Sequence, residues 1–195
     1  MIRDNAKQLT TLTINSGIVD EESRAIYEYG FELMLSGIIN IILMAIISVM
    51  FSRFYDWLLF LSAFIPIRTK AGGYHANSHI KCIAIGTIVF MIFLGIWQLQ
   101  IEWRVLIIQI AIISLLIIIA ISPVEVHNKI LKKEHRQKNR VASICIGLVN
   151  LLIAIIIYKN YEIMASMNFY FAGVFVATFS MLVAKAIKGK EEKND

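Results

Sequence analysis

The feature that most constrains this chain is a series of apolar runs, each close to or above the length needed to cross a lipid bilayer. The longest covers residues 26–51, and others cover residues 83–99, 105–121, 141–158 and 163–184. A helix can cross the hydrocarbon core because it satisfies its own backbone hydrogen bonds. None of the runs alternates polar and apolar residues as a transmembrane barrel requires. The sequence therefore predicts an all-α polytopic membrane protein.

A sixth apolar segment, residues 57–67, is shorter than the others. At about 1.5 Å of rise per residue it covers roughly half of a hydrocarbon core about 30 Å thick. Two interpretations stay open. The segment either enters the membrane and returns, or crosses it where the neighbouring polar loop dips into a water-accessible pocket.

Composition agrees with a membrane protein, because 58% hydrophobic residues, 17% charged residues and a mean hydropathy of +0.69 lie outside the range of soluble domains. The net charge of +5 does not indicate nucleic acid as a partner, since the Lys and Arg residues lie between apolar runs. Anionic lipid headgroups are the expected partner of this charge. We find no repeat or domain boundary, so residues 1–195 are expected to form a single membrane-embedded domain.

Residues 1–25 form the expected N-terminal amphipathic segment. Ile2, Ala6, Leu9 and Leu12 follow one another at helical spacing, with polar residues between them. This pattern predicts a short helix that lies on a membrane surface.

The distribution of basic residues predicts the orientation of the chain. Sixteen of the nineteen Lys and Arg residues lie in residues 1–25, 68–82, 122–140 and 185–195. If all six apolar segments cross, these four regions share one side, which the positive-inside rule makes cytoplasmic. If residues 57–67 are re-entrant, the N-terminus moves outside while residues 68–82 stay cytoplasmic. The expected location is the cell membrane, with a cytoplasmic basic loop at 122–140 and a charged tail at 185–195.

Residues 68–82 concentrate the groups that can do chemistry. They hold two glycines, two histidines, three basic residues and Cys82. A cysteine attacks as its thiolate, and because an unperturbed thiol has a pKa of about 8.5, a nearby histidine is needed to take the proton at neutral pH. Cys82 lies at the start of an apolar helix, where the helix N-terminus favours an anion.

Two histidines are candidates for the base. His79 is three residues before Cys82 and would share its face on a helix, whereas His75 is seven residues before it, about 10 Å along a straight helix. His75 can reach the thiol if the chain bends, and Gly72-Gly73 makes non-helical backbone expected nearby. Spacing alone slightly favours His79.

Arg68, Gly73-Tyr74-His75-Ala76 and Cys82 resemble the signature of the accessory gene regulator protein B family, membrane cysteine endopeptidases that mature peptide precursors for quorum sensing. The run from Pro123 to Lys129 is similar to that family's loop of a proline followed by a lysine. Here Ile130 follows the lysine where members commonly have proline, which changes the local turn. The likeness extends over nearly the whole chain, because the size, the amphipathic start, the hydrophobic segments and the basic loop also fit.

The resemblance implies a catalytic dyad of His75 and Cys82, with Arg68 and Gly73 as supporting positions. This assignment overrules the helical preference for His79 and implies a bend between the dyad residues. The resemblance further implies that Cys82 attacks a peptide carbonyl in a small amphipathic precursor and holds the product as a thioester, which then closes to a thiolactone or lactone. It implies no cofactor or metal, and it suggests a homodimer.

Substrate binding is a separate hypothesis. Lys129, Lys132 and Lys133 in the basic loop could bind the acidic portion of the precursor by charge attraction.

Two other functions are compatible with the sequence. His75, His79 and Cys82 could form a metal or haem site, because histidines at i and i+4 face the same way on a helix and a thiol is a further ligand. A peptide transporter or adaptor without chemistry is the other alternative, although intramembrane charges, which mark transport paths, are nearly absent here.

The second cysteine, Cys145, lies in an apolar run and is interpreted as a packing residue.

Overall fold

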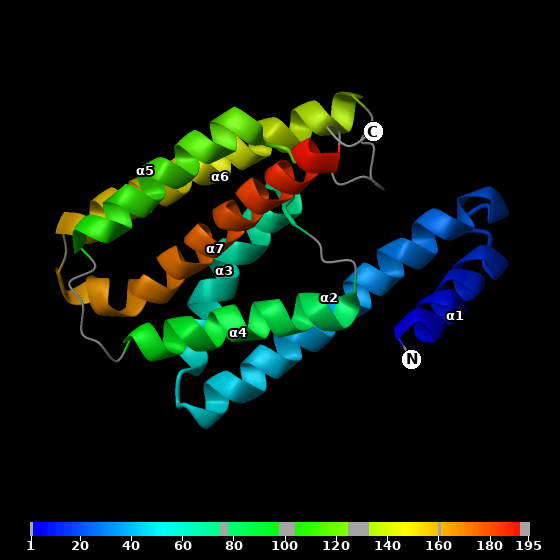
Figure 1. Ribbon diagram of the computed structural model, residues 1–195, viewed down its shortest axis with the longest axis horizontal. Coiled ribbons are helices and arrows are strands. Elements are labelled where there is room, and N and C mark those ends of the chain that lie inside the picture. The colour runs from blue at the N-terminus through cyan, green and yellow to red at the C-terminus, as the bar shows by residue number, and fades with distance from the viewer. Residues whose placement is uncertain (1, 75–77, 98–103, 125–132, 160, 192–195) are drawn as a thin grey trace. The chain divides into compact units, whose positions relative to one another are not determined.

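The computed structural model describes residues 2–74, 78–97, 104–124, 133–159 and 161–191 (Figure 1). These ranges contain helices and no β-strand, which confirms the all-α prediction. The helices are α1 (Ile2–Asn15), a 3₁₀ turn (Glu21–Ser23), α2 (Arg24–Met50), α3 (Phe54–Ala71), α4 (His79–Trp97), α5 (Arg104–Ile121), α6 (Lys133–Lys159) and α7 (Tyr161–Glu191).

Several of these helices are suited to a membrane. By length and composition, Glu21–Met50, Glu134–Lys159 and Met167–Gly189 can each cross a bilayer, and Ile80–Ile96 and Val105–Ile121 are shorter apolar helices. These helices confirm the prediction of a polytopic membrane protein.

The short apolar segment, residues 57–67, lies within helix α3. This helix is one uninterrupted helix of 18 residues with Pro66 inside it, and it does not turn back within its length. At about 1.5 Å of rise per residue it is about 27 Å long, close to the thickness of the hydrocarbon core. Helix α3 includes Asp56, Arg68 and Lys70 and is not among the helices whose length and composition suit a membrane span, so both interpretations of this segment stay predictions.

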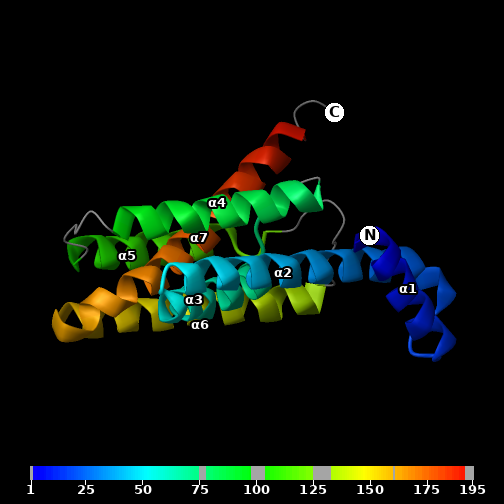
Figure 2. The same cartoon turned by 90° about the horizontal axis from the view of Figure 1, so that it is seen from below.

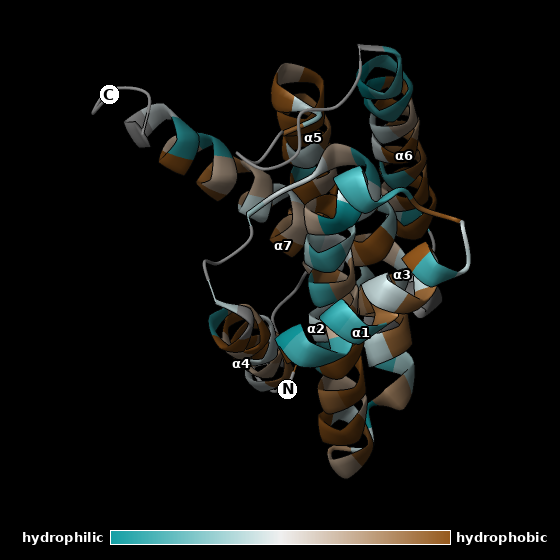
Figure 3. Cartoon of the chain, turned by 90° about the vertical axis from the view of Figure 1, so that its right-hand side faces the viewer, coloured by the Kyte–Doolittle hydropathy of each residue, from teal (hydrophilic) through white to brown (hydrophobic). Residues whose placement is uncertain are grey.

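The helices extend beyond the apolar runs. Helix α6 begins at Lys133 and α7 continues to Glu191, so parts of the predicted basic loop and charged tail are helical. Lys, Glu, Arg and Gln are good helix formers in water, and Lys138 Nζ lies 2.8 Å from Glu134 Oε1 at i,i+4 spacing. Figure 3 shows the polar residues gathered at one end of α6, followed by an apolar remainder.

The chain divides into two compact units, residues 1–50 with 76–94 and residues 51–75 with 95–195. We describe each unit by itself, and the single-domain interpretation stays a prediction.

In the first unit α1 folds back along the beginning of α2 (Figure 2). Arg24 Nη1 donates to Thr11 Oγ1 at 3.2 Å, and Arg3 Nε lies 3.7 Å from Glu32 Oε1. Ala6 and Thr10 are the buried residues of α1, whereas Ile2 and Leu9 of the predicted apolar pattern are half-buried and Leu12 is exposed.

Helices α2 and α4 meet in the first unit through small and polar residues. Thr87 Oγ1 donates to Asn40 Oδ1 at 3.3 Å. A Cβ atom on Gly86 would lie 2.6 Å from Asn40 Nδ2, so the glycine leaves room for the Asn40 side chain. Small residues and side-chain hydrogen bonds are the usual means of holding helices together in lipid.

We expect Gly86→Val to lower the stability of the first unit. The added side chain must move the Asn40 amide and break its bond to Thr87, and loss of a hydrogen bond of this kind costs about 0.5–1.5 kcal/mol. A thermal melt of the purified protein in detergent would show a lower midpoint. Gly37→Val is the matched control, because a Cβ atom at Gly37 meets nothing within 4 Å. Equal midpoints for the two variants would contradict this view of the contact.

The second unit packs α3, α5, α6 and α7 around one apolar core. All four helices contribute residues to it: Ala63, Ile67, Ala71, Ile107, Ala111, Ile118, Ala154, Ile157, Phe171, Val174, Ala177 and Met181. Gly173 lies directly against the Phe60 carbonyl, which sets the close approach of α7 to α3. Some of the polar groups inside are paired, since the Ser114 and Thr178 hydroxyls lie 3.1 Å apart and Tyr170 donates to Asn150 Oδ1 at 2.6 Å.

The ends of α3, α5 and α7 meet at one end of the second unit, together with the start of α6. Val124, just after α5, bonds to Ala71 at the end of α3, and Tyr74 bonds to Ser180 in α7. Residues of α6 and α7 line a common pocket beside Val124. This arrangement agrees with the shared side that the charge distribution predicts for these segments. That this side is cytoplasmic stays a prediction.

Candidate active site

The chain leaves α3 in a tight glycine turn. Gly72 has φ +80° and Gly73 has φ +144°, both in the region that residues with a side chain rarely adopt. Val124 N donates to Ala71 O at 2.8 Å, and a Cβ atom on Gly72 would overlap the Val124 carbonyl. Two segments that are distant in sequence therefore lie backbone against backbone here, as glycine at position 72 allows.

Arg68 fixes the backbone of the residue that precedes His75. Its Nη2 donates to the Tyr74 carbonyl, and its Nη1 lies 3.5 Å from Ser180 Oγ. Tyr74 N donates to Ser180 O at 3.0 Å, so both backbone polar groups of Tyr74 are held. A charged donor makes the Arg68 bond to the carbonyl a strong one.

Gly73 fits inside this anchor because it has no side chain. A Cβ atom at this position would overlap the Arg68 guanidinium and crowd the Ser180 hydroxyl. Arg68 and Gly73, the two supporting positions of the sequence motif, thus belong to one structural element with Tyr74 and Ser180. We call these four residues the Tyr74 anchor.

We expect Gly73→Ala to disturb the Tyr74 anchor. The substitution strains the backbone at φ +144° and displaces the guanidinium, and strain of this kind costs about 1–3 kcal/mol. The thermal midpoint of the purified protein should fall. Gly189→Ala serves as the control, because Gly189 lies in α7 with nothing within 4 Å of an added Cβ atom. A midpoint for Gly73→Ala equal to that of the control would contradict the anchor.

Cys82 lies in the first turn of α4, in the other unit. Its backbone N donates to Ser78 O at 3.0 Å, and its side chain is half-buried, with the exposed Lys81 next to it. Cys82 is therefore neither sealed in a core nor fully open to its surroundings.

Helix α4 begins at His79, and Ser78 before it is not helical. His79 shares the first turn of α4 with Cys82, as its spacing predicts.

Several predicted site residues lie outside the described residues. These are His75, Lys129 and Lys132. Lys133 is the first residue of α6, and the structure describes its backbone. Across the described ranges, no group of three or more His, Cys, Asp and Glu residues is placed to hold a metal ion.

The structure corrects the interpretation of Cys145 and adds a residue that the sequence did not point to. Cys145 is exposed on α6, so it is not a packing residue of the core. Ser180, which completes the Tyr74 anchor, was missed, because nothing marks it apart from being a polar residue in an apolar run.

The family model described as Accessory gene regulator B matches residues 6–184 of the chain. Two relatives from Clostridium perfringens carry the name AgrB-like protein, one from strain SM101 and one, numbered 2, from strain 13. Each is 28% identical to this chain over 169 residues, which cover 80% of this chain and 79% of the relative. No solved structure matches the chain. The family match spans most of the sequence, and the chain belongs to the accessory gene regulator B family, which acts in quorum sensing.

Proposed function

We propose that this protein is a membrane cysteine endopeptidase that cleaves a small amphipathic precursor peptide and releases a cyclic signal. Family membership and the motif from Arg68 to Cys82 support the proposal. The observation that carries it is the Tyr74 anchor, because it fixes the backbone that leads directly into His75. A general base must be held in place to act on a neighbouring thiol.

In the first step His75 takes the proton of the Cys82 thiol, and the thiolate attacks a carbonyl carbon of the precursor. A carbon–sulfur bond forms as the peptide carbon–nitrogen bond breaks. The imidazolium returns its proton to the leaving amine, which departs with the C-terminal part of the precursor. The N-terminal part stays on Cys82 as a thioester.

In the second step a cysteine or serine side chain of the bound precursor attacks the thioester. His75 accepts the proton of that side chain, the new thiolactone or lactone forms, and Cys82 leaves as the thiolate. Water must be kept from the thioester until the ring closes, and a site at the edge of the membrane helps to exclude it.

We further propose that the catalytic stretch faces the cytoplasm and that Lys129, Lys132 and Lys133 bind the acidic part of the precursor. The excess of basic residues around the stretch supports the orientation. A homodimer follows from the same family resemblance.

Co-expression with a small amphipathic precursor peptide tests the function. We expect mass spectrometry to find a released C-terminal fragment and an N-terminal product that is lighter than its linear acid by one water molecule. A precursor whose ring-forming cysteine or serine is replaced by alanine is the control, and it should give no cyclic product. Intact precursor exported without cleavage would instead support the transporter alternative.

A further inference from the structure

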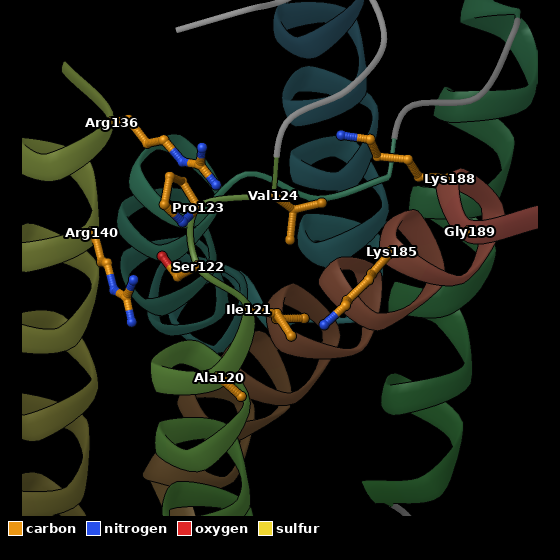
Figure 4. Close-up of a pocket in the computed structure, with 10 residues that line it drawn as sticks. All are labelled: Ala120, Ile121, Ser122, Pro123, Val124, Arg136, Arg140, Lys185, Lys188 and Gly189. Atoms are coloured by element: carbon orange, nitrogen blue, oxygen red, sulfur yellow. The ribbon is translucent and has the colours of Figure 1, made fainter. Parts of the chain in front are cut away.

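A basic pocket of about 370 Å³ lies where α5 ends, between α6 and α7 (Figure 4). Arg136 and Arg140 reach it from α6, and Lys185 and Lys188 reach it from α7. None of the described residues that line it is a carboxylate. Arg140 and Lys185 place positive charge on two sides of the cavity, so its ligand is expected to be an anion.

The position of the pocket at the ends of the apolar runs indicates which kind of anion it binds. Arg140 directly precedes the apolar run that begins at Val141, and Lys185 directly follows the run that ends at Ala184. We therefore expect the pocket to lie where apolar helices leave the hydrocarbon core, at the level of lipid phosphates. Basic pockets between transmembrane helices at this level bind anionic lipid headgroups.

Ser122 supplies an independent sign of a missing ligand. Its side chain lines the pocket and is 6% exposed, yet its Oγ has no hydrogen-bond partner. Figure 4 shows this hydroxyl directed toward α6. A buried hydroxyl without a partner is costly, and a phosphate oxygen in the pocket would satisfy it.

Two arginines of α6 line the pocket, so part of the basic charge of this helix lies at one defined place. Arg136 and Arg140 are four residues apart and line the pocket together, whereas Glu134 and Lys138 pair with each other and do not line it. Arginine is well suited to phosphate, because its planar guanidinium can donate two parallel hydrogen bonds.

We propose that this pocket binds the phosphate of an anionic phospholipid, with Arg140 and Lys185 as its principal charges and the Ser122 hydroxyl as a neutral donor. The proposal does not depend on the proposed peptidase activity. Under this proposal, a lipid contacts the ends of α5, α6 and α7, and its binding depends on how much anionic lipid the membrane contains.

Native mass spectrometry of the full chain in detergent tests the proposal, with phosphatidylglycerol and phosphatidylcholine added in parallel titrations. We expect one phosphatidylglycerol to bind at least about tenfold more tightly than phosphatidylcholine, since each basic side chain near an anionic headgroup changes binding about fivefold. The double variant Arg140→Gln/Lys185→Gln should lose this preference. The matched control Lys138→Gln/Lys159→Gln removes the same charge from α6 residues that do not line the pocket, and it should bind like the wild type.

Ser122→Ala is the second variant, because removal of an unpartnered hydroxyl does not weaken the empty protein. It should weaken phosphatidylglycerol binding by about threefold to tenfold while leaving the lipid-free melting midpoint unchanged. Unchanged lipid affinity would remove the hydroxyl from the site.

Four further results would overturn the lipid assignment. Equal binding of the two lipids, or wild-type binding by the Arg140 and Lys185 double variant, would show that the pocket does not select a phosphate headgroup. Displacement of phosphatidylglycerol by equimolar inorganic phosphate would assign the site to a free anion. Displacement by a peptide of ten glutamates, weakened by the double variant, would assign it to an acidic peptide.

Discussion

Cys82→Ala is expected to abolish cleavage of the precursor while the protein still inserts into the membrane. The thiol is the atom that forms the acyl-enzyme, and removal of a nucleophile typically lowers the rate by about 10⁴-fold or more. Alanine suits the half-buried position in the first turn of α4, because it is a good helix former and leaves the Cys82 backbone bond to Ser78 in place. Release of the C-terminal fragment, followed by mass spectrometry, is the measurement.

Cys145→Ala is the matched control for this variant. It removes the other cysteine, which is exposed on α6. Its cleavage rate should stay within about twofold of the wild type, as for a surface substitution away from any special feature. Cleavage by Cys82→Ala at the rate of this control would remove Cys82 from the mechanism.

His75→Ala should lower the rate at neutral pH by about 10²- to 10⁴-fold, the usual contribution of a general acid–base residue. Residual activity should rise at higher pH, because hydroxide in solution can then take the proton that His75 no longer accepts. Recovery should stay partial, because the leaving amine still lacks its proton donor. A pH profile of cleavage measures both effects.

His79→Ala separates the two candidate bases. His79 shares the first turn of α4 with Cys82 and is the partner that helical spacing favours. We expect this variant to keep most of its activity and the wild-type pH profile. A large loss in His79→Ala, combined with wild-type rates in His75→Ala, would exchange the roles of the two histidines.

Apolar runs predicted the helices well because hydrophobicity is a local property of the sequence. The same signal misplaced the ends of α6 and α7, since a polar helical end that extends into water leaves no mark in hydropathy. The glycine pair did predict non-helical backbone at residues 72 and 73, as their positive φ angles confirm. Glycine readily adopts positive φ angles that other residues avoid, so its presence is a strong local signal.

Other features depend on contacts that no local pattern carries. Ser180 meets Arg68 across 112 residues, and nothing in the apolar run around Ser180 indicates that contact. Cys145 lies on a helix that is apolar on all sides at that point, so the sequence could not tell its inner face from its outer face. The basic pocket likewise requires knowing that α6 and α7 bring their charged ends together beside Ser122.

Trapping the acyl-enzyme is the measurement that tests the central proposal most directly. A precursor that lacks its ring-forming cysteine or serine cannot complete the second step, so the thioester should accumulate on the enzyme. We predict an enzyme whose mass is increased by that of the N-terminal fragment less one water molecule, with the added mass on the peptide that contains Cys82 and removable by hydroxylamine. Cleavage of that precursor with no adduct at any time, or with a stable adduct on another residue, would contradict the proposal.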